Sequence, residues 1–181
     1  YLQEKFPHKK VVHVREPGST TIAQEIRILA QAKEFDEAMH PLTEAYLYAA
    51  ARAQLLQTVV TNTLKQWGIV ISDRSFISSL AYQWEARWLG FETVNEINKM
   101  AIGDILPDYV LYMDGDINKA MARTFDSTWD KFENMWRGFF EKVVNGYVKA
   151  SMIPEIAPKW YVIDASGTIE EVFERVKTTI W

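Results

Sequence analysis

The side chains most able to do chemistry in this chain follow directly after an apolar run at 68–72. That run is short and rich in β-branched residues, which predicts a strand covered on both faces. Asp73 and Arg74 come next, at the predicted junction between this strand and a helix. Ligands of open α/β sheets gather at such junctions, where the helix offers free backbone N–H groups. We therefore expect Arg74 to bind a phosphate and Asp73 to hold the water shell of a magnesium ion, the alternative being that Asp73 only caps the helix.

A second candidate segment is Arg15-Glu16-Pro17-Gly18-Ser19-Thr20, after a strand expected at 10–14. Pro17 and Gly18 force a turn, and Arg15 offers a planar guanidinium that can grip phosphate oxygens in pairs. The alternative interpretation makes Arg15 and Glu16 solvated residues of an ordinary Pro-Gly turn.

A third segment contains Tyr48 and Arg52, which lie four positions apart and so share one face of a helix. An aromatic ring beside an arginine can stack on a nucleobase while the guanidinium donates to its exocyclic oxygens. The alternative is a core tyrosine beside an arginine whose apolar stem is buried.

Composition narrows the class of protein. The 181 residues are 48% apolar, which suits a single domain spanning 1–181, and the net charge of −4 argues against a broad nucleic acid footprint. Without cysteine, disulfides and Cys-based metal sites are excluded, and His8, His13 and His40 lack ligand spacing. We expect a cytoplasmic protein with no membrane segment and no nucleic acid partner.

Strands and helices alternate along the predicted chain. Strands are expected at 10–14, 69–72, 109–113 and 160–163, and the main helices at 43–65, 75–88, 93–105, 117–123, 132–150 and 168–180. The buried face of the helix at 43–65 is predicted to comprise Leu47, Ala50, Leu55, Val59 and Leu64. This order predicts an α/β fold, a parallel sheet with helices on both faces.

Four motifs resemble, in order and spacing, the successive signatures of thymidylate kinases. They are the segment 15–20, the alanine-rich helix ending in Arg52 and Gln54, Asp73-Arg74 with 78–83, and the run 162–166. The resemblance covers nearly the whole chain and implies a P-loop nucleoside monophosphate kinase-like fold. It also implies transfer of the ATP γ-phosphoryl group to dTMP, which gives dTDP and ADP with Mg2+ as cofactor.

The resemblance also assigns residues to the dTMP site. Arg15 and Arg74 would hold the phosphate, Tyr48 would stack on thymine where the family usually has phenylalanine, and Arg52 would donate to a thymine carbonyl. The remaining members of that site are Ser79 and Gln83 around the base and Tyr82 near the deoxyribose.

Catalysis and ATP binding are assigned in the same way. Arg15, Asp73 and Arg74 would be the catalytic residues, with Asp73 contacting magnesium through water. Arg123 and Lys131 would contact ATP, beside a lid at about 124–131. A homodimer is implied through the helix at 43–65 and the helix after Asp73.

The chain departs from the family pattern because it has no Gly-x-x-x-x-Gly-Lys-Ser/Thr loop to cradle ATP. The expectation is that the parent protein continues upstream of Tyr1, and that the central first strand, between 69–72 and 109–113, is missing. These residues alone are then expected to be unstable and inactive. Two alternatives stay open: a kinase for another nucleoside monophosphate, and a non-catalytic nucleotide-binding module.

Overall fold

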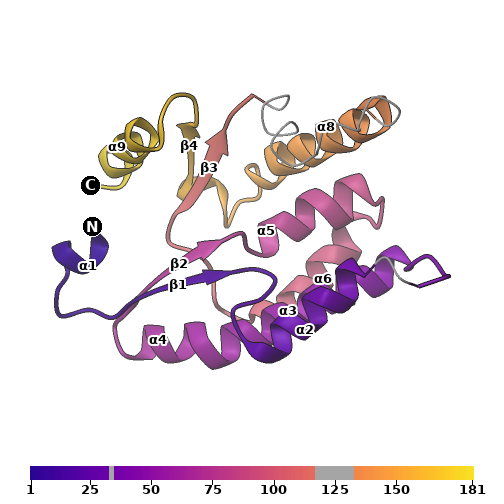
Figure 1. Cartoon of the computed structure of the whole chain (residues 1–181), viewed down its shortest axis with the longest axis horizontal. Coiled ribbons are helices and arrows are strands. Elements are labelled where there is room, and N and C mark those ends of the chain that lie inside the picture. Colours follow the sequence, from indigo (N-terminus) through magenta and orange to yellow (C-terminus); the bar gives the residue numbers. More distant parts are fainter. Residues whose placement is uncertain (33–34, 117–132) are drawn as a thin grey trace. The chain divides into compact units, whose positions relative to one another are not determined.

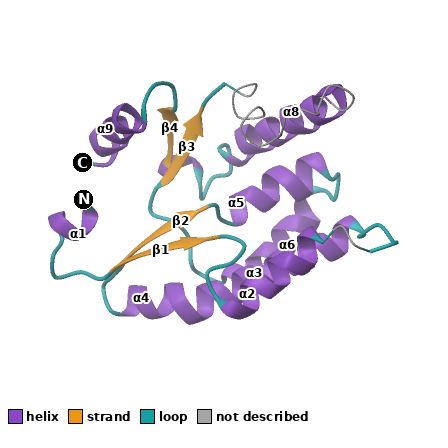
Figure 2. Ribbon diagram, viewed as in Figure 1, coloured by secondary structure: helices purple, strands orange, loops and turns teal. Residues whose placement is uncertain are grey.

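The structure is a computed structural model that describes residues 1–32, 35–116 and 133–181. Two compact units make up the chain, Tyr1–Leu106 and Pro107–Trp181. Figure 1 shows the elements along the chain, and Figure 2 distinguishes helices, strands and loops.

Two parallel strands organise the first unit. β1 (Val11–Arg15) pairs with β2 (Ile69–Asp73) in a register that runs from Val11 opposite Ile69 to Arg15 opposite Asp73. The β-branched residues of both runs favour this extended conformation. Because the two strands are parallel and end in register, the residues that follow them emerge at the same edge of the pair.

Helices precede, separate and follow these strands (Figure 1). Their bounds are α1 Leu2–Lys5, α2 Thr21–Gln31, α3 Pro41–Leu55, a π-helical segment Leu56–Val60, α4 Thr61–Lys65, α5 Phe76–Ser79, a π-helical segment Leu80–Ala86 and α6 Phe91–Ile102. The helices predicted at 43–65 and 75–88 are thus confirmed, each with a π-helical part. The helix predicted at 93–105 begins and ends earlier, since Gly103 at φ 56° terminates it.

The core of the first unit forms where α3 packs against α2 and α6. Small side chains let the helices approach closely, and the buried positions of α3 are Ala45, Ala49, Ala51, Arg52 and Leu55. Of the predicted buried face, Leu55 is buried and Leu47 and Val59 are half-buried, but Ala50 and Leu64 are exposed, so the prediction was wrong for these last two positions. α3 is apolar almost all round, so periodicity alone could not choose which side faces the core.

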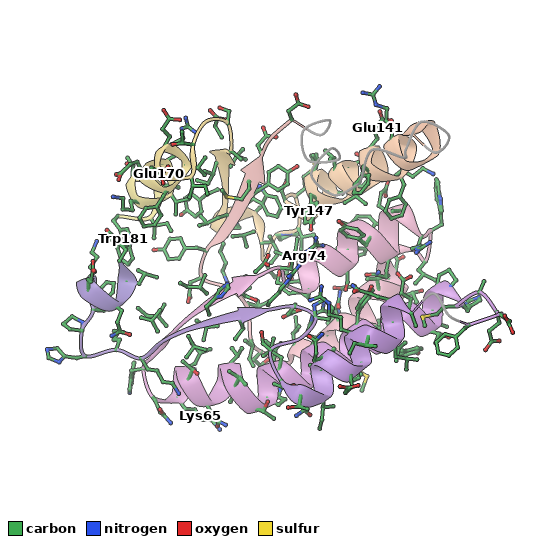
Figure 3. The ribbon with its side chains drawn as sticks, viewed as in Figure 1. Lys65, Arg74, Glu141, Tyr147, Glu170 and Trp181 are labelled. Atoms are coloured by element: carbon green, nitrogen blue, oxygen red, sulfur yellow. The ribbon has the colours of Figure 1, made fainter. Side chains whose placement is uncertain are left out.

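The second unit contains another parallel pair, β3 (Val110–Asp114) and β4 (Trp160–Asp164). Figure 1 shows α8 (Glu133–Ala150) and α9 (Ile169–Ile180) on opposite sides of this pair, and a short 3-10 turn, Ala157–Lys159, leads into β4. Tyr112 stacks on Trp160 with ring centroids 5.4 Å apart and lies 5.7 Å from the ring of Tyr147, which is labelled in Figure 3.

Several expectations about these elements can be compared with the structure. All four predicted strands are present within one residue of their expected bounds, and among the described residues they form two parallel pairs, β1 with β2 and β3 with β4. The helix predicted at 117–123 lies outside the described residues. In the part of the chain that the structure describes, no helix is both long and apolar enough to cross a membrane.

Candidate functional site

The carboxyl ends of β1 and β2 bring three of the predicted site residues together. Arg15 and Asp73 are opposite each other as the last pair of the register, and Arg15 Nε lies 3.3 Å from Asp73 Oδ2. Both side chains are about half exposed, at 52% each, so this ion pair stays accessible to a ligand. The backbone N–H of Glu16 donates to the Asp73 carbonyl at 2.9 Å, which extends the pairing one residue past the strands.

Arg74 continues this edge in an unusual backbone conformation. Its φ of 69° lies in the left-handed region, which a bulky residue adopts at a cost of roughly 1–3 kcal/mol. Its guanidinium carbon lies 5.5 Å from the ring centroid of Tyr82, at cation–π distance. Figure 3 shows Arg74 between the end of β2 and the start of α5. The fold therefore holds a second exposed cation next to Arg15 and Asp73, a group that we call the arginine rim.

The turn after β1 is shaped to keep its residues close to the rim. Ser19 Oγ accepts from the Arg15 backbone N–H at 2.8 Å, and the Thr20 side chain caps α2 by accepting from the Ala23 N–H at 3.1 Å. Gly18 has φ 133°, and a Cβ there would lie 3.0 Å from Gln24 Oε1. Glycine suits this position because a side chain would be strained at this backbone angle and would also displace the Gln24 side chain.

Arg52 lies in the interior rather than at the surface, with only 4% of its surface exposed. Its Nε donates to Glu16 Oε2 at 2.6 Å, its Nη1 to Asn98 Oδ1 at 2.7 Å and its Nη2 to Ser79 Oγ at 3.1 Å. Glu16 is also buried, at 5% exposed, so the guanidinium and carboxylate neutralise each other away from water. We call these four residues the Arg52 cluster.

A second chain of polar contacts runs from the buried Gln83, which is 3% exposed, toward the surface. Its Nε2 donates to Glu44 Oε1 at 2.8 Å, and Glu44 Oε2 accepts from Arg87 Nη2 at 3.1 Å. Burial raises the pKa of the nearby Tyr48 hydroxyl, and the negative charge of Glu44 raises that pKa further. Tyr48 is therefore a neutral phenol at physiological pH, with Glu44 one helical turn before it on α3.

The arrangement suits a phosphorylated ligand with a polar ring system. Two guanidiniums at an exposed rim can neutralise a phosphate, and a few buried polar groups with fixed donors can select one planar partner. Among the described residues no group of three or more His, Cys, Asp or Glu side chains is placed to hold a metal ion.

Comparison with known proteins identifies the family. The model of the thymidylate kinase family matches residues 1–176. This chain belongs to the thymidylate kinase family. Curated relatives include the thymidylate kinase of Thermosipho africanus (strain TCF52B), 36% identical over 180 residues that cover 99% of this chain and 86% of the relative. That of Finegoldia magna is 40% identical over 166 residues, which cover 91% of this chain and 80% of the relative.

A solved structure gives the same result for the fold. The thymidylate kinase from Ehrlichia chaffeensis superposes with a TM-score of 0.76 over 100% of this chain and 87% of that one, at 23% identity. At this identity the likeness concerns the fold alone, and it confirms the predicted α/β class of P-loop nucleoside monophosphate kinases.

The structure brings together part of the predicted set of thymidylate kinase residues. Arg15, Asp73, Arg74 and Tyr82 meet at the rim, and Arg52 contacts Ser79 in the interior. Tyr48 and Gln83 both neighbour Glu44. The two predicted ATP-contacting residues, Arg123 and Lys131, and the lid at about 124–131 lie outside the described residues.

Sequence reasoning missed Glu44 and Asn98, and treated Glu16 only as a turn residue. A signal existed for Asn98, because it interrupts the apolar face that α6 forms with Val94 and Ala101. Glu44 could have been noticed because it precedes Tyr48 and Arg52 at helical spacing on α3. No local signal marks Glu16, whose partner is far away in the sequence.

Proposed function

We propose that the arginine rim of this chain is the dTMP site of a kinase reaction in which ATP phosphorylates dTMP, giving dTDP and ADP. Membership of the thymidylate kinase family supports this reaction, since the family transfers phosphate from ATP to dTMP in nucleotide synthesis. The observation that carries the site assignment is the convergence of Arg15, Asp73 and Arg74 at one edge of the β1–β2 pair.

The phosphate of dTMP is assigned to Arg15 and Arg74. Phosphoryl transfer depends mainly on positioning and on charge neutralisation, and two guanidiniums offer both. Asp73 lies against Arg15 and limits the directions in which that guanidinium can turn. The cation–π contact with the Tyr82 ring orients Arg74 in a similar way, and it supports the assignment of Tyr82 to the deoxyribose.

Binding of the thymine base is assigned to side chains in the interior of the first unit. Arg52 donates to a thymine carbonyl, the Tyr48 ring stacks on the base, and Ser79 and Gln83 complete the pocket. Burial supports this assignment, because Arg52, Ser79 and Gln83 are each no more than 5% exposed and are already oriented by protein partners. Preorganised donors of this kind bind a ligand without an additional ordering cost.

Magnesium fits the rim on chemical grounds. Mg2+ is commonly bound by one or two carboxylates, several waters and substrate phosphates, and Asp73 offers one half-exposed carboxylate. When bound, the ion supplies charge neutralisation between the two nucleotides. Asp73 would hold one of its waters. Arg123 and Lys131 are assigned to ATP by resemblance only.

Binding measurements with dTMP and thymidine test the rim. Arg15→Ala and Arg74→Ala should each weaken dTMP binding about ten- to hundredfold, because hydrogen bonds between charged groups contribute about 1.5–3 kcal/mol. Thymidine binding should change little, since it lacks the phosphate. Arg175→Ala is the matched control, because this arginine lies in the other unit and donates to the backbone carbonyls of Asp164 and Ser166. Equal losses for dTMP and thymidine would show that the phosphate binds elsewhere.

The choice of acceptor is tested with four nucleotides in the full-length protein. Coupled ADP release should be fastest with dTMP and slower with dUMP, dGMP and AMP. No preference for dTMP would favour a kinase of another nucleoside monophosphate. Binding of dTMP without turnover would favour a non-catalytic module.

A cytoplasmic homodimer is also proposed. Tyr46 on α3 and Leu64 on α4 are 58% and 44% exposed, on the long helix where the family resemblance puts the contact between subunits. Sedimentation equilibrium should give twice the chain mass, and Tyr46→Glu should lower it toward one chain.

A further inference from the structure

Asn98 is a buried polar side chain whose position on its helix has no simple packing reason. It is 2% exposed and lies on the face of α6 that also buries Val94 and Ala101. A leucine at this position would fill the same space without the cost of burying an amide, which must be hydrogen-bonded to be tolerated. The residue is therefore explained by what its amide contacts.

Both ends of the amide have partners. Oδ1 accepts from Arg52 Nη1 at 2.7 Å, and Nδ2 lies 3.5 Å from the carbonyl oxygen of Phe76, at the start of α5. The contact to Phe76 orients the amide with its oxygen toward Arg52, because the opposite orientation would set two donors against each other. Asn98 thus links α6 to α5 and to the guanidinium.

Three partners from different elements determine the guanidinium plane of Arg52. Glu16 follows β1 and engages Nε, Ser79 ends α5 and engages Nη2, and Asn98 on α6 engages Nη1. Glu16 supplies the opposite charge. Asn98 carries no charge, so it acts on the guanidinium of Arg52 by orienting it rather than by neutralising it.

The N–H groups of Arg52 that are not bonded to these three partners show why the orientation of the guanidinium matters. Guanidinium carries five N–H groups, two of them on each terminal nitrogen. The bonds to the three described partners use one N–H on each of Nε, Nη1 and Nη2. One N–H on each terminal nitrogen is not used by these three bonds, and its direction follows from where Asn98 and Ser79 hold those nitrogens.

We propose that Asn98 is a positioning residue of the base pocket, which sets the direction in which Arg52 donates to a ring carbonyl of the pyrimidine. This inference rests on the proposed function, in which Arg52 contacts the base. Arg52 can only donate, so a ligand with an amino group in place of that carbonyl sets donor against donor and is rejected. Asn98 therefore contributes to selectivity between pyrimidines and leaves the phosphate contacts unchanged.

The experiment compares dTMP with 5-methyl-dCMP, in which an amino group replaces one ring carbonyl. Both dissociation constants are measured by calorimetry on the same protein, because their ratio does not depend on the folded fraction. The original protein should prefer dTMP by about a hundredfold or more. Asn98→Ala should lower that ratio by at least about tenfold, because a misdirected N–H forfeits the hydrogen bond that distinguishes the two ligands.

Two further variants separate positioning from packing. Asn98→Leu fills the volume without an acceptor and should lower the ratio as Asn98→Ala does. Asn98→Asp keeps an oxygen facing Nη1 and should keep the ratio within about threefold. Asn95→Ala, on the same helix and half-buried, is the matched control and should leave the ratio unchanged.

Each outcome has one meaning. A lower ratio for Asn98→Ala and Asn98→Leu, retained in Asn98→Asp, supports the proposal. Equal weakening of both ligands in Asn98→Ala and Asn98→Leu overturns it and leaves Asn98 as a packing residue. If the original protein binds dTMP without preferring it to 5-methyl-dCMP, the assignment of Arg52 to the base fails first, and the role of Asn98 with it.

Discussion

Replacing Glu16 by glutamine should destabilise the first unit strongly, although the change is nearly isosteric. The Glu16 and Arg52 side chains are only 6% and 5% exposed, and the two charges are 2.6 Å apart. The amide of Glu16→Gln can still accept a hydrogen bond from Arg52 Nε. It leaves the guanidinium charge buried without a counterion.

The size of the effect follows from this geometry. Coulomb's law with an effective dielectric constant of about 20 gives roughly 6 kcal/mol for two unit charges 2.6 Å apart. Part of this is retained by the hydrogen bond, and breaking a buried pair typically costs about 3–5 kcal/mol. Such a loss is a large fraction of the total stability of a domain, which is about 5–15 kcal/mol.

Urea unfolding measures this loss, with the midpoint and slope extracted by linear extrapolation. Glu96→Gln is the matched control, because Glu96 forms an ion pair with Lys99 at 3.2 Å whose side chains are 71% and 62% exposed. Its free energy of unfolding should change by less than about 1 kcal/mol.

Two results would refute this reasoning. One is a change for Glu16→Gln no larger than that for Glu96→Gln, which would mean that burial adds nothing to the pair. The other comes from combining Glu16→Gln with Arg52→Met. The double variant should be more stable than the sum of the single effects predicts, by about 1–3 kcal/mol, and strict additivity would deny any coupling.

Three more predictions concern single residues. Because burial and Glu44 raise the pKa of Tyr48 above 10.0, the stability that the neutral phenol contributes is complete below that pH and is lost as pH rises through the folded-state pKa. Tyr48→Phe should remove this alkaline loss in pH-dependent melting and retain dTMP binding. Thr168 caps α9 in a reciprocal capping box with Glu171, so Thr168→Ala should lower the free energy of unfolding of the second unit by about 1 kcal/mol. Hydrogen bonds from the Ser166 side chain and backbone lower the pKa of Asp164 below 3.8. The stability from Asp164 is therefore complete above that pH and is lost as pH falls through the folded-state pKa, a loss that Asp164→Asn should abolish.

Matched controls exist for these three changes. Tyr46→Phe alters an exposed tyrosine on the same helix as Tyr48 and should leave the alkaline loss in place. Thr178→Ala, near the other end of α9, removes no cap and should not destabilise the second unit. Glu155→Gln removes an exposed carboxylate elsewhere in that unit, and the acid loss should remain. A control that behaves like its partner variant would contradict the corresponding prediction.

Local sequence was enough to predict the strands and the arginine rim. A short β-branched run predicts a strand wherever it lies, and parallel strands end at a common edge, so Arg15, Asp73 and Arg74 had to emerge near one another. These features depend on contacts between residues close in sequence or on the geometry of one sheet.

Tertiary structure alone decided which groups surround Arg52 and Gln83. The partners of Arg52 are 36, 46 and 27 positions away, and Glu44 is 39 positions from Gln83. Hydrophobic periodicity cannot reveal contacts between residues so far apart in the sequence, because these contacts depend on which faces of α3, α5 and α6 pack together. The sequence by itself therefore determined which side chains could bind a nucleotide and at which edge. Packing of the helices determined how the interior donors are oriented, because a buried polar group must find its partner wherever the fold brings one within reach.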